Sequence, residues 1–519
     1  MSKPHPDKRR AIGVLLHPTA LPSDSGCGTF GEPARIWVRE LAKNGISVWQ
    51  MLPLGPCDSS GSPYSSPSSF SLNPYFLDTK DLFEEGFLSS SFKLESVGKS
   101  ADPNCYLNLE ALNQSIKLIG FYLRENWSYQ SPRIHQAFYK WCKKQFWLED
   151  HVTFTELRNQ YDFLPWWKWP KKFSSNDNLA IKNWKKKYRK ELLEHRLVQW
   201  HLYLQWAKLK DYANELGVYL FGDIPFYVSR DSSDVWSNRG LFSILSSGEL
   251  KMQSGVPPDY FSSTGQLWGT PVYEWRIHRL TSFRWWRKRI LQHLKQFDLL
   301  RLDHFRALES FWGVPGKDLT AMNGKWIKSP GSDLLKDLKH DLGGKLPIVA
   351  EDLGVITNEV ESLRNEFGLM GMKVLQFAFD GNENNPYLPE NITGNNWIIY
   401  TGTHDNPTTL SWWQNLDLET KKRLEVRFDD SDDSPVWKLL DMGLSSEAKL
   451  VIAPIQDLLC LGDSATFNKP GTIGNNWKWR LKVFDELLFK SLYSYGERSR
   501  FWGRSDVFSC EFVNSESSL

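Results

Sequence analysis

The run Asp298-Leu-Leu-Arg-Leu-Asp303 decides the fold, because it is a short apolar segment that stops at an acidic residue. Short runs of this kind suit parallel strands that are covered on both faces. Seven further runs of similar character lie along the chain, at residues 12–16, 46–52, 218–224, 348–350, 372–379, 397–400 and 450–455. The sequence therefore predicts eight buried strands.

Helical patterns lie between these runs. After the first run, four apolar residues have the i, i+3, i+4, i+7 spacing of one helix face, namely Ala34, Trp37, Val38 and Leu41. Residues 187–216 form a long amphipathic stretch that Gly217 closes just before the third run. Eight strands that alternate with helices are the count of a (β/α)8 barrel. We expect an α/β fold, a TIM barrel that forms one catalytic domain over residues 1–519.

The runs are unevenly spaced, and the excess predicts insertions. More residues separate the second run from the third, and the third from the fourth, than a crossover helix requires. We expect an inserted subdomain at residues 56–184, after the second strand, and an inserted loop or subdomain at residues 225–282, after the third. Both lie in strand-to-helix loops.

Composition excludes several classes of protein. The 519 residues contain 63 Lys and Arg against 61 Asp and Glu, so the net charge of +2 provides no field for nucleic acid or an anionic membrane. No stretch approaches the roughly 20 apolar residues of a spanning helix. The six cysteines show no CxxC pair and no Cys/His spacing for zinc. We expect a cytoplasmic protein without metal, nucleic-acid partner or membrane partner.

Acidic residues stand at or just after the ends of five runs: Asp223, Asp303, Glu351, Asp380 and Asp405. Any one of them alone fits a helix cap or a turn. In a barrel, however, the carboxyl ends of the strands meet at one rim, where catalytic groups project. Five carboxylates at one rim favour an active site.

Two of these carboxyl groups are expected to differ in protonation. Arg301 lies two residues before Asp303, so both face the same way and the guanidinium favours an ionised Asp303, a usable nucleophile. Glu351 follows an apolar strand, where desolvation raises its pKa and keeps it protonated as a general acid. Such a pair, roughly 5 to 5.5 Å apart, defines a retaining glycosidic centre. Asp405, beside His404, would hold sugar hydroxyls and strain the ring.

Motifs along nearly the whole chain resemble the 4-alpha-glucanotransferases of glycoside hydrolase family 77, also called amylomaltases or disproportionating enzymes, in the alpha-amylase superfamily. Three of them surround the carboxylates: Arg301-Leu-Asp-His-Phe-Arg306, Ala350-Glu-Asp-Leu-Gly354 and Thr401-Gly-Thr-His-Asp-Asn406. Others are Gly13-Val-Leu-Leu-His-Pro18, Ser62-Pro-Tyr-Ser-Ser66, Gly222-Asp-Ile-Pro225, Gly265-Gln-Leu-Trp-Gly269 and Asn476-Trp-Lys-Trp-Arg480. Their order and number exclude chance similarity.

The resemblance implies that Asp303 is the nucleophile, Glu351 the acid/base and Asp405 the transition-state stabiliser. It also implies substrate-binding roles for Tyr64, Asp223, Gln266, Trp268, Arg301, His304, Asp380 and His404. The rings of Tyr64 and Trp268 suit stacking on glucose. His304 is equally compatible with a structural partner of a carboxylate.

The expected activity is transfer of a 1,4-alpha-D-glucan segment to the 4-hydroxyl of glucose or another glucan, with maltooligosaccharides, glycogen or starch-type glucans as partners. The alternative is an amylase-like hydrolase, because hydrolases and transferases share these carboxylates. A glycan-binding protein without activity is a further alternative, against which the intact acidic set argues. No metal or organic cofactor is implied. Pro407 departs from the family pattern and leaves the shape of its loop open.

Overall fold

The computed structural model describes residues 10–23, 26–89, 107–258, 262–428, 431–472 and 474–504. Part of the first predicted insertion, residues 90–106, lies outside the described residues, as do Cys105 and Cys510.

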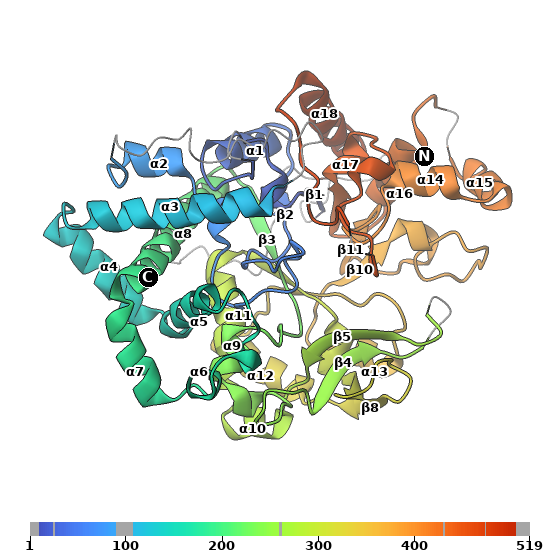
Figure 1. The fold of residues 1–519 in the computed structure, drawn as a ribbon. Helices are drawn as coiled ribbons and strands as arrows, with labels where there is room; N and C mark the ends of the chain where they lie inside the picture. Colours follow the sequence, from blue (N-terminus) through green and yellow to red (C-terminus); the bar gives the residue numbers. More distant parts are fainter. Residues whose placement is uncertain are drawn as a thin grey trace.

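Eight parallel strands form the central sheet (Figure 1). They are β1 (Ala11–Leu15), β2 (Val48–Gln50), β3 (Tyr219–Ile224), β6 (Leu299–Leu302), β9 (Ile348–Ala350), β10 (Gly371–Val374), β11 (Trp397–Tyr400) and β12 (Leu450–Pro454). Their order is β10-β11-β12-β1-β2-β3-β6-β9, and a parallel bridge between Val349 and Met370 links the two ends of this order. The sheet therefore closes into the predicted (β/α)8 barrel, and each of the eight predicted runs supplies one strand.

The register of the barrel strands brings the predicted carboxylates together. Asp223 of β3 lies opposite Arg301 of β6, and Leu302 of β6 lies opposite Ala350 of β9. Asp303 and Glu351 are the residues that follow this last pair. Because the two strands are parallel neighbours, both carboxyl groups leave the sheet at the same level.

Helices cover the barrel in the expected alternation. The first is α1 (Glu32–Lys43), whose buried residues are the four that the spacing predicts. The predicted long helix is α8 (Arg189–Glu215), which packs against α1 and β3. The later helices are α9 (Ser233–Ser237), α10 (Trp275–Leu280), α11 (Arg284–Gln296), α12 (Gly331–Asp341), α13 (Asn358–Glu366), α14 (Thr409–Asn415), α15 (Leu418–Glu425), α16 (Pro435–Ser445), α17 (Ile455–Leu458) and α18 (Glu486–Phe501).

A group of helices occupies the connection between β2 and β3, where the sequence predicts the first insertion. They are α2 (Thr79–Glu84), α3 (Leu109–Trp127), α4 (Pro132–Lys144), α5 (Leu148–Gln160), α6 (Lys171–Ser174) and α7 (Asn178–Lys187). Figure 1 shows α3, α4, α5 and α7 gathered around α8 on one side of the molecule. The boundaries of this inserted subdomain, residues 56–184, stay a prediction.

A second, antiparallel sheet was not anticipated from the sequence. It has the order β5-β4-β7-β8 and consists of β4 (Met252–Val256), β5 (Gln266–Pro271), β7 (Ser310–Pro315) and β8 (Lys325–Lys328). Its first two strands lie in the predicted insertion after β3, whereas β7 and β8 follow β6. The insertion after β3 therefore pairs with a segment beyond its predicted end at residue 282.

No helix in the described ranges is both long and apolar enough to cross a membrane.

Candidate active site

A cleft of about 660 Å³ lies at the carboxyl ends of the barrel strands. Eight of the predicted site residues line it: Tyr64, Gln266, Trp268, Arg301, Asp303, His304, Glu351 and Asp405. They come from the connection after β2, from β5, from β6 and the turn after it, and from the loops after β9 and β11. Asp303 and Glu351 therefore face one cavity.

Arg301 is the centre of the charged cluster. Its Nη1 lies 2.6 Å from Oδ2 of Asp223, and its Nη2 lies 2.8 Å from Oδ1 of Asp303. Burial opposes the charge of this guanidinium, but the two carboxylates outweigh burial and raise the pKa of Arg301 well above its usual range. The permanent cation fixes the orientation of Asp303, whose side chain remains 30% exposed.

Asp223 lies behind the cleft rather than in its wall. It is buried, and the hydroxyl of Tyr64 donates to its Oδ2 at 2.6 Å. Burial raises the pKa of Asp223 to about 7; Arg301 opposes this shift and the charge of Asp303 adds to it. The structure therefore places Asp223 as a support for Tyr64 and Arg301.

Glu351 accepts hydrogen bonds from two backbone amides. The N–H of His304 lies 2.7 Å from Oε2, and that of Leu353 lies 3.2 Å from Oε1. Burial raises the pKa of Glu351 to about 7, with Arg301 opposing the shift and Asp303 adding to it. This is the direction that its apolar strand predicts. A carboxyl group with this pKa carries a proton for a large part of the time near neutral pH.

Asp405 is fixed by a residue that sequence reasoning left out. The side-chain amide of Asn468 donates to Oδ1 of Asp405 at 2.6 Å, and the backbone N–H of Asn468 donates to the carbonyl of His404 at 3.1 Å. Nε2 of His404 lies 3.4 Å from the same Asp405 oxygen. Asn468 stands eight residues before the Asn476–Arg480 motif, but spacing alone gives no sign of this contact.

Aromatic rings form two walls of the cleft. Tyr64 and Trp477 belong to one wall. Tyr64 stacks on His404, which is not itself a lining residue, with centroids 5.3 Å apart and planes 9° apart, and Trp477 lies against both rings. On the other wall Trp268 meets His304 edge to face at 4.9 Å. The left-handed backbone of His304 and Trp477, at φ of 51° and 68°, is strained for these residue types. Trp477 lines the cleft although sequence reasoning gave it no role.

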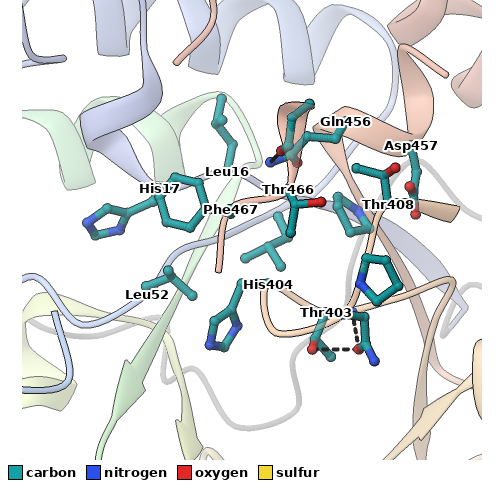
Figure 2. Close-up of a pocket in the computed structure, with 15 residues that line it drawn as sticks. Leu16, His17, Leu52, Thr403, His404, Thr408, Gln456, Asp457, Thr466 and Phe467 are labelled. Atoms are coloured by element: carbon teal, nitrogen blue, oxygen red, sulfur yellow. Dashed lines mark hydrogen bonds between the residues drawn. The ribbon is translucent and has the colours of Figure 1, made fainter. Parts of the chain in front are cut away.

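His404 also reaches a small cavity of about 30 Å³ behind the cleft (Figure 2). His17, from the Gly13–Pro18 motif, lines the same cavity, and Figure 2 shows both rings on the side nearest Leu52. Burial lowers the pKa of His404 and lowers that of His17 to about 3. Both rings are therefore neutral, and His404 is not in the wall of the large cleft itself.

Asp380 is the one predicted substrate-binding residue that is exposed and lies outside both cavities. Its Oδ1 accepts a hydrogen bond from the backbone N–H of Asn382 at 2.9 Å, as in an Asx turn.

His304 contacts Glu351 through its backbone, because its N–H donates to the Glu351 carboxylate. Burial lowers the pKa of the His304 ring to about 3. Within the described ranges, no group of three or more His, Cys, Asp or Glu residues is arranged to hold a metal ion.

Comparison with known proteins agrees with this geometry. A family described as 4-alpha-glucanotransferase matches residues 16–485. A 4-alpha-glucanotransferase of Synechocystis is 42% identical over 477 residues, which cover 91% of this chain and 94% of the relative. One from Thermus thermophilus is 40% identical over 486 residues, covering 91% and 95%. The solved structure of the amylomaltase from Streptococcus agalactiae in complex with acarbose has a TM-score of 0.90 at 33% identity and covers 96% of this chain and 100% of its own.

Proposed function

The chain belongs to the 4-alpha-glucanotransferase family, and we propose that Asp303, Glu351 and Asp405 carry out the reaction of that family. The enzyme is a glycosyltransferase that moves a segment of a 1,4-alpha-D-glucan to the 4-hydroxyl of glucose or of another glucan. The proposal assigns each step of this transfer to a residue of the cleft.

In the first step Asp303 attacks the anomeric carbon. A bond forms between its carboxylate oxygen and C1 of the sugar, while the bond between C1 and the glycosidic oxygen breaks. Glu351 gives its proton to the leaving oxygen, so the shortened glucan departs as an alcohol. The raised pKa of Glu351 supports this role, because the proton is held near neutral pH.

In the second step the 4-hydroxyl of an acceptor sugar replaces the departed chain. Glu351, now ionised, takes the hydroxyl proton as the new bond to C1 forms, and the bond to Asp303 breaks. Two inversions at C1 retain the alpha configuration. The walls of Tyr64 and Trp268 offer flat faces on which an acceptor glucose can stack in competition with water.

Asp405 stabilises the positive charge that develops on the sugar ring in the transition state of each step. Its contact with Asn468 keeps the carboxylate in one orientation toward the cleft. Gln266 lies on β5 in the same cavity, where its amide can bind sugar hydroxyls.

The single observation that carries the proposal is the pairing of Leu302 with Ala350, which puts Asp303 and Glu351 side by side in one cleft. Incubation with maltotriose tests the activity directly. We expect glucose together with a ladder of longer maltooligosaccharides. Products that only become shorter would identify a hydrolase, a reading that the comparisons do not favour.

We propose maltooligosaccharides, glycogen and starch-type glucans as the substrates of this chain. Support comes from the family and from the amylomaltase that was solved with acarbose. A cytoplasmic location stays a prediction from the sequence.

A further inference from the structure

A third cavity, of about 210 Å³, lies between α5, α9 and α11. None of its lining residues also lines the catalytic cleft. Four aromatic side chains contribute to its wall: Phe70, Phe146, Trp147 and Trp285. The transfer mechanism uses none of them.

The rings of this cavity offer apolar surface. Phe146 is 43% exposed although Nζ of Lys288 lies 4.3 Å from its ring centroid. Trp147 and Trp285 are buried, and Phe70 meets the rings of Phe146 and Trp285 edge to face. The exposed ring of Phe146 therefore offers apolar area to a ligand in this cavity.

The charges around the cavity are balanced. The lining includes two acidic residues, Asp150 and Asp234, and two basic ones, Arg284 and Lys288. One oxygen of Asp234 already accepts the N–H of Ser69 at 2.8 Å. A balanced set gives no net attraction for an anion or a cation, whereas it supplies acceptors and donors for a neutral, polar molecule.

We propose that this cavity is a second saccharide site, which takes one glucose unit of an alpha-1,4-glucan chain. A pyranose has an apolar C–H face for the aromatic rings and hydroxyls that both donate and accept hydrogen bonds. The volume is below the roughly 300–1,000 Å³ of a drug-sized ligand site, which suits a single sugar ring. The inference rests on the alpha-glucan chemistry of the family.

One loop connects the second saccharide site to the catalytic cleft. Tyr64 of this loop lines the cleft, and Phe70 lines the second site. The loop is held against α9, because the N–H of Ser233 donates to the carbonyl of Pro67 at 2.9 Å and Asp234 accepts from Ser69. A glucan bound at the second site therefore keeps its remaining units near the enzyme, which raises their effective concentration at the cleft. Short substrates gain no such increase in effective concentration.

The test removes one ring and one charge from the second site in the full-length enzyme. The double variant Phe146→Ala/Arg284→Ala changes two exposed residues, so the fold should be retained. Phe121→Ala is the matched control, because Phe121 is 42% exposed, carries a guanidinium 4.9 Å from its ring centroid and lines neither cavity. Affinity for soluble starch is measured by native affinity electrophoresis, and kcat/KM is measured with maltotriose.

We expect the double variant to bind starch about 3- to 10-fold more weakly than the control, with kcat/KM for maltotriose unchanged. Arg284→Gln alone should weaken binding in the same direction. Starch affinity equal to that of Phe121→Ala would overturn the proposal. A parallel fall in kcat/KM for maltotriose would also overturn it, because the loss would then arise in the cleft. Production of the maltooligosaccharide ladder by the unaltered enzyme tests the transferase activity separately.

Discussion

Asn468 shows how a single amide can orient a carboxylate, here that of Asp405, which we propose as the transition-state stabiliser. Its side chain holds Oδ1 of Asp405 and its backbone holds the loop of His404. The carboxylates themselves were predictable, because each follows an apolar strand. Asn468 and Trp477 were not, because they come from a connection after the last strand and reach the cleft only through tertiary packing.

Asn468→Ala tests this positioning role. We expect kcat for maltotriose transfer to fall about 10- to 100-fold, because Asp405 loses the contact that fixes its orientation. KM and the thermal unfolding temperature should change little, since the stacking residues Tyr64 and Trp268 are untouched. Asn468→Asp is the companion variant: it places a second carboxylate against Asp405 and should restore no activity. Unchanged kcat in the alanine variant would remove Asn468 from this role.

The raised pKa of Glu351 predicts that activity falls on the alkaline side of neutral pH, the alkaline limb of the pH profile. With a pKa of about 7, the protonated acid becomes rarer by about tenfold for each pH unit above 7, so kcat/KM for maltotriose should decline there. Asp223 has a similar pKa in the same charged cluster, so the limb of the pH profile belongs to the cluster.

A donor with a fluoride leaving group separates these two carboxyl groups. Fluoride needs no proton from Glu351, so its initial release from an alpha-glucosyl fluoride should stay level between about pH 6.5 and about pH 8.5. If the activity with this donor falls at the same alkaline pH as the activity with maltotriose, the group that titrates is Asp223 rather than Glu351.

At the scale of elements, the eight strands were predictable and the second sheet was not. Buried parallel strands appear in the sequence as continuous apolar runs. The strands β5 and β8 are largely exposed, and their sheet joins segments on either side of β6. Pairing between segments so far apart leaves no local pattern.

The segment that carries Asn468 and Trp477 depends on Arg480. This buried guanidinium donates to the carbonyls of Thr19 and Leu21 at 3.2 Å and 3.1 Å, which ties the segment to the loop after β1. Arg480→Ala should lower the free energy of unfolding by about 2–4 kcal/mol, because charged hydrogen bonds are lost in a buried place. Transfer activity should fall as well. Chemical denaturation with the exposed Lys482→Ala as control measures the effect, and equal stability of the two variants would contradict it.

At the scale of the whole molecule, the barrel brings together residues from β2 to β12 that are hundreds of positions apart in the chain. Closure through Val349 and Met370 sets the level at which each loop leaves the rim. The apolar runs predict the strands and the family motifs predict the roles. The contacts between loops, which orient Asp405 and Tyr64, follow only from the folded structure.

The most direct test is to trap the covalent intermediate and locate it. Glu351→Gln incubated with an alpha-glucosyl fluoride should still form the glycosyl-enzyme, because fluoride leaves without protonation, while breakdown of the intermediate is slow without the base. Peptide mass spectrometry should then find one glucosyl unit on the peptide that contains Asp303, and none when Asp303→Asn is added. Attachment at Asp223 or Asp405 would contradict the account, as would rapid fluoride release with no covalent adduct.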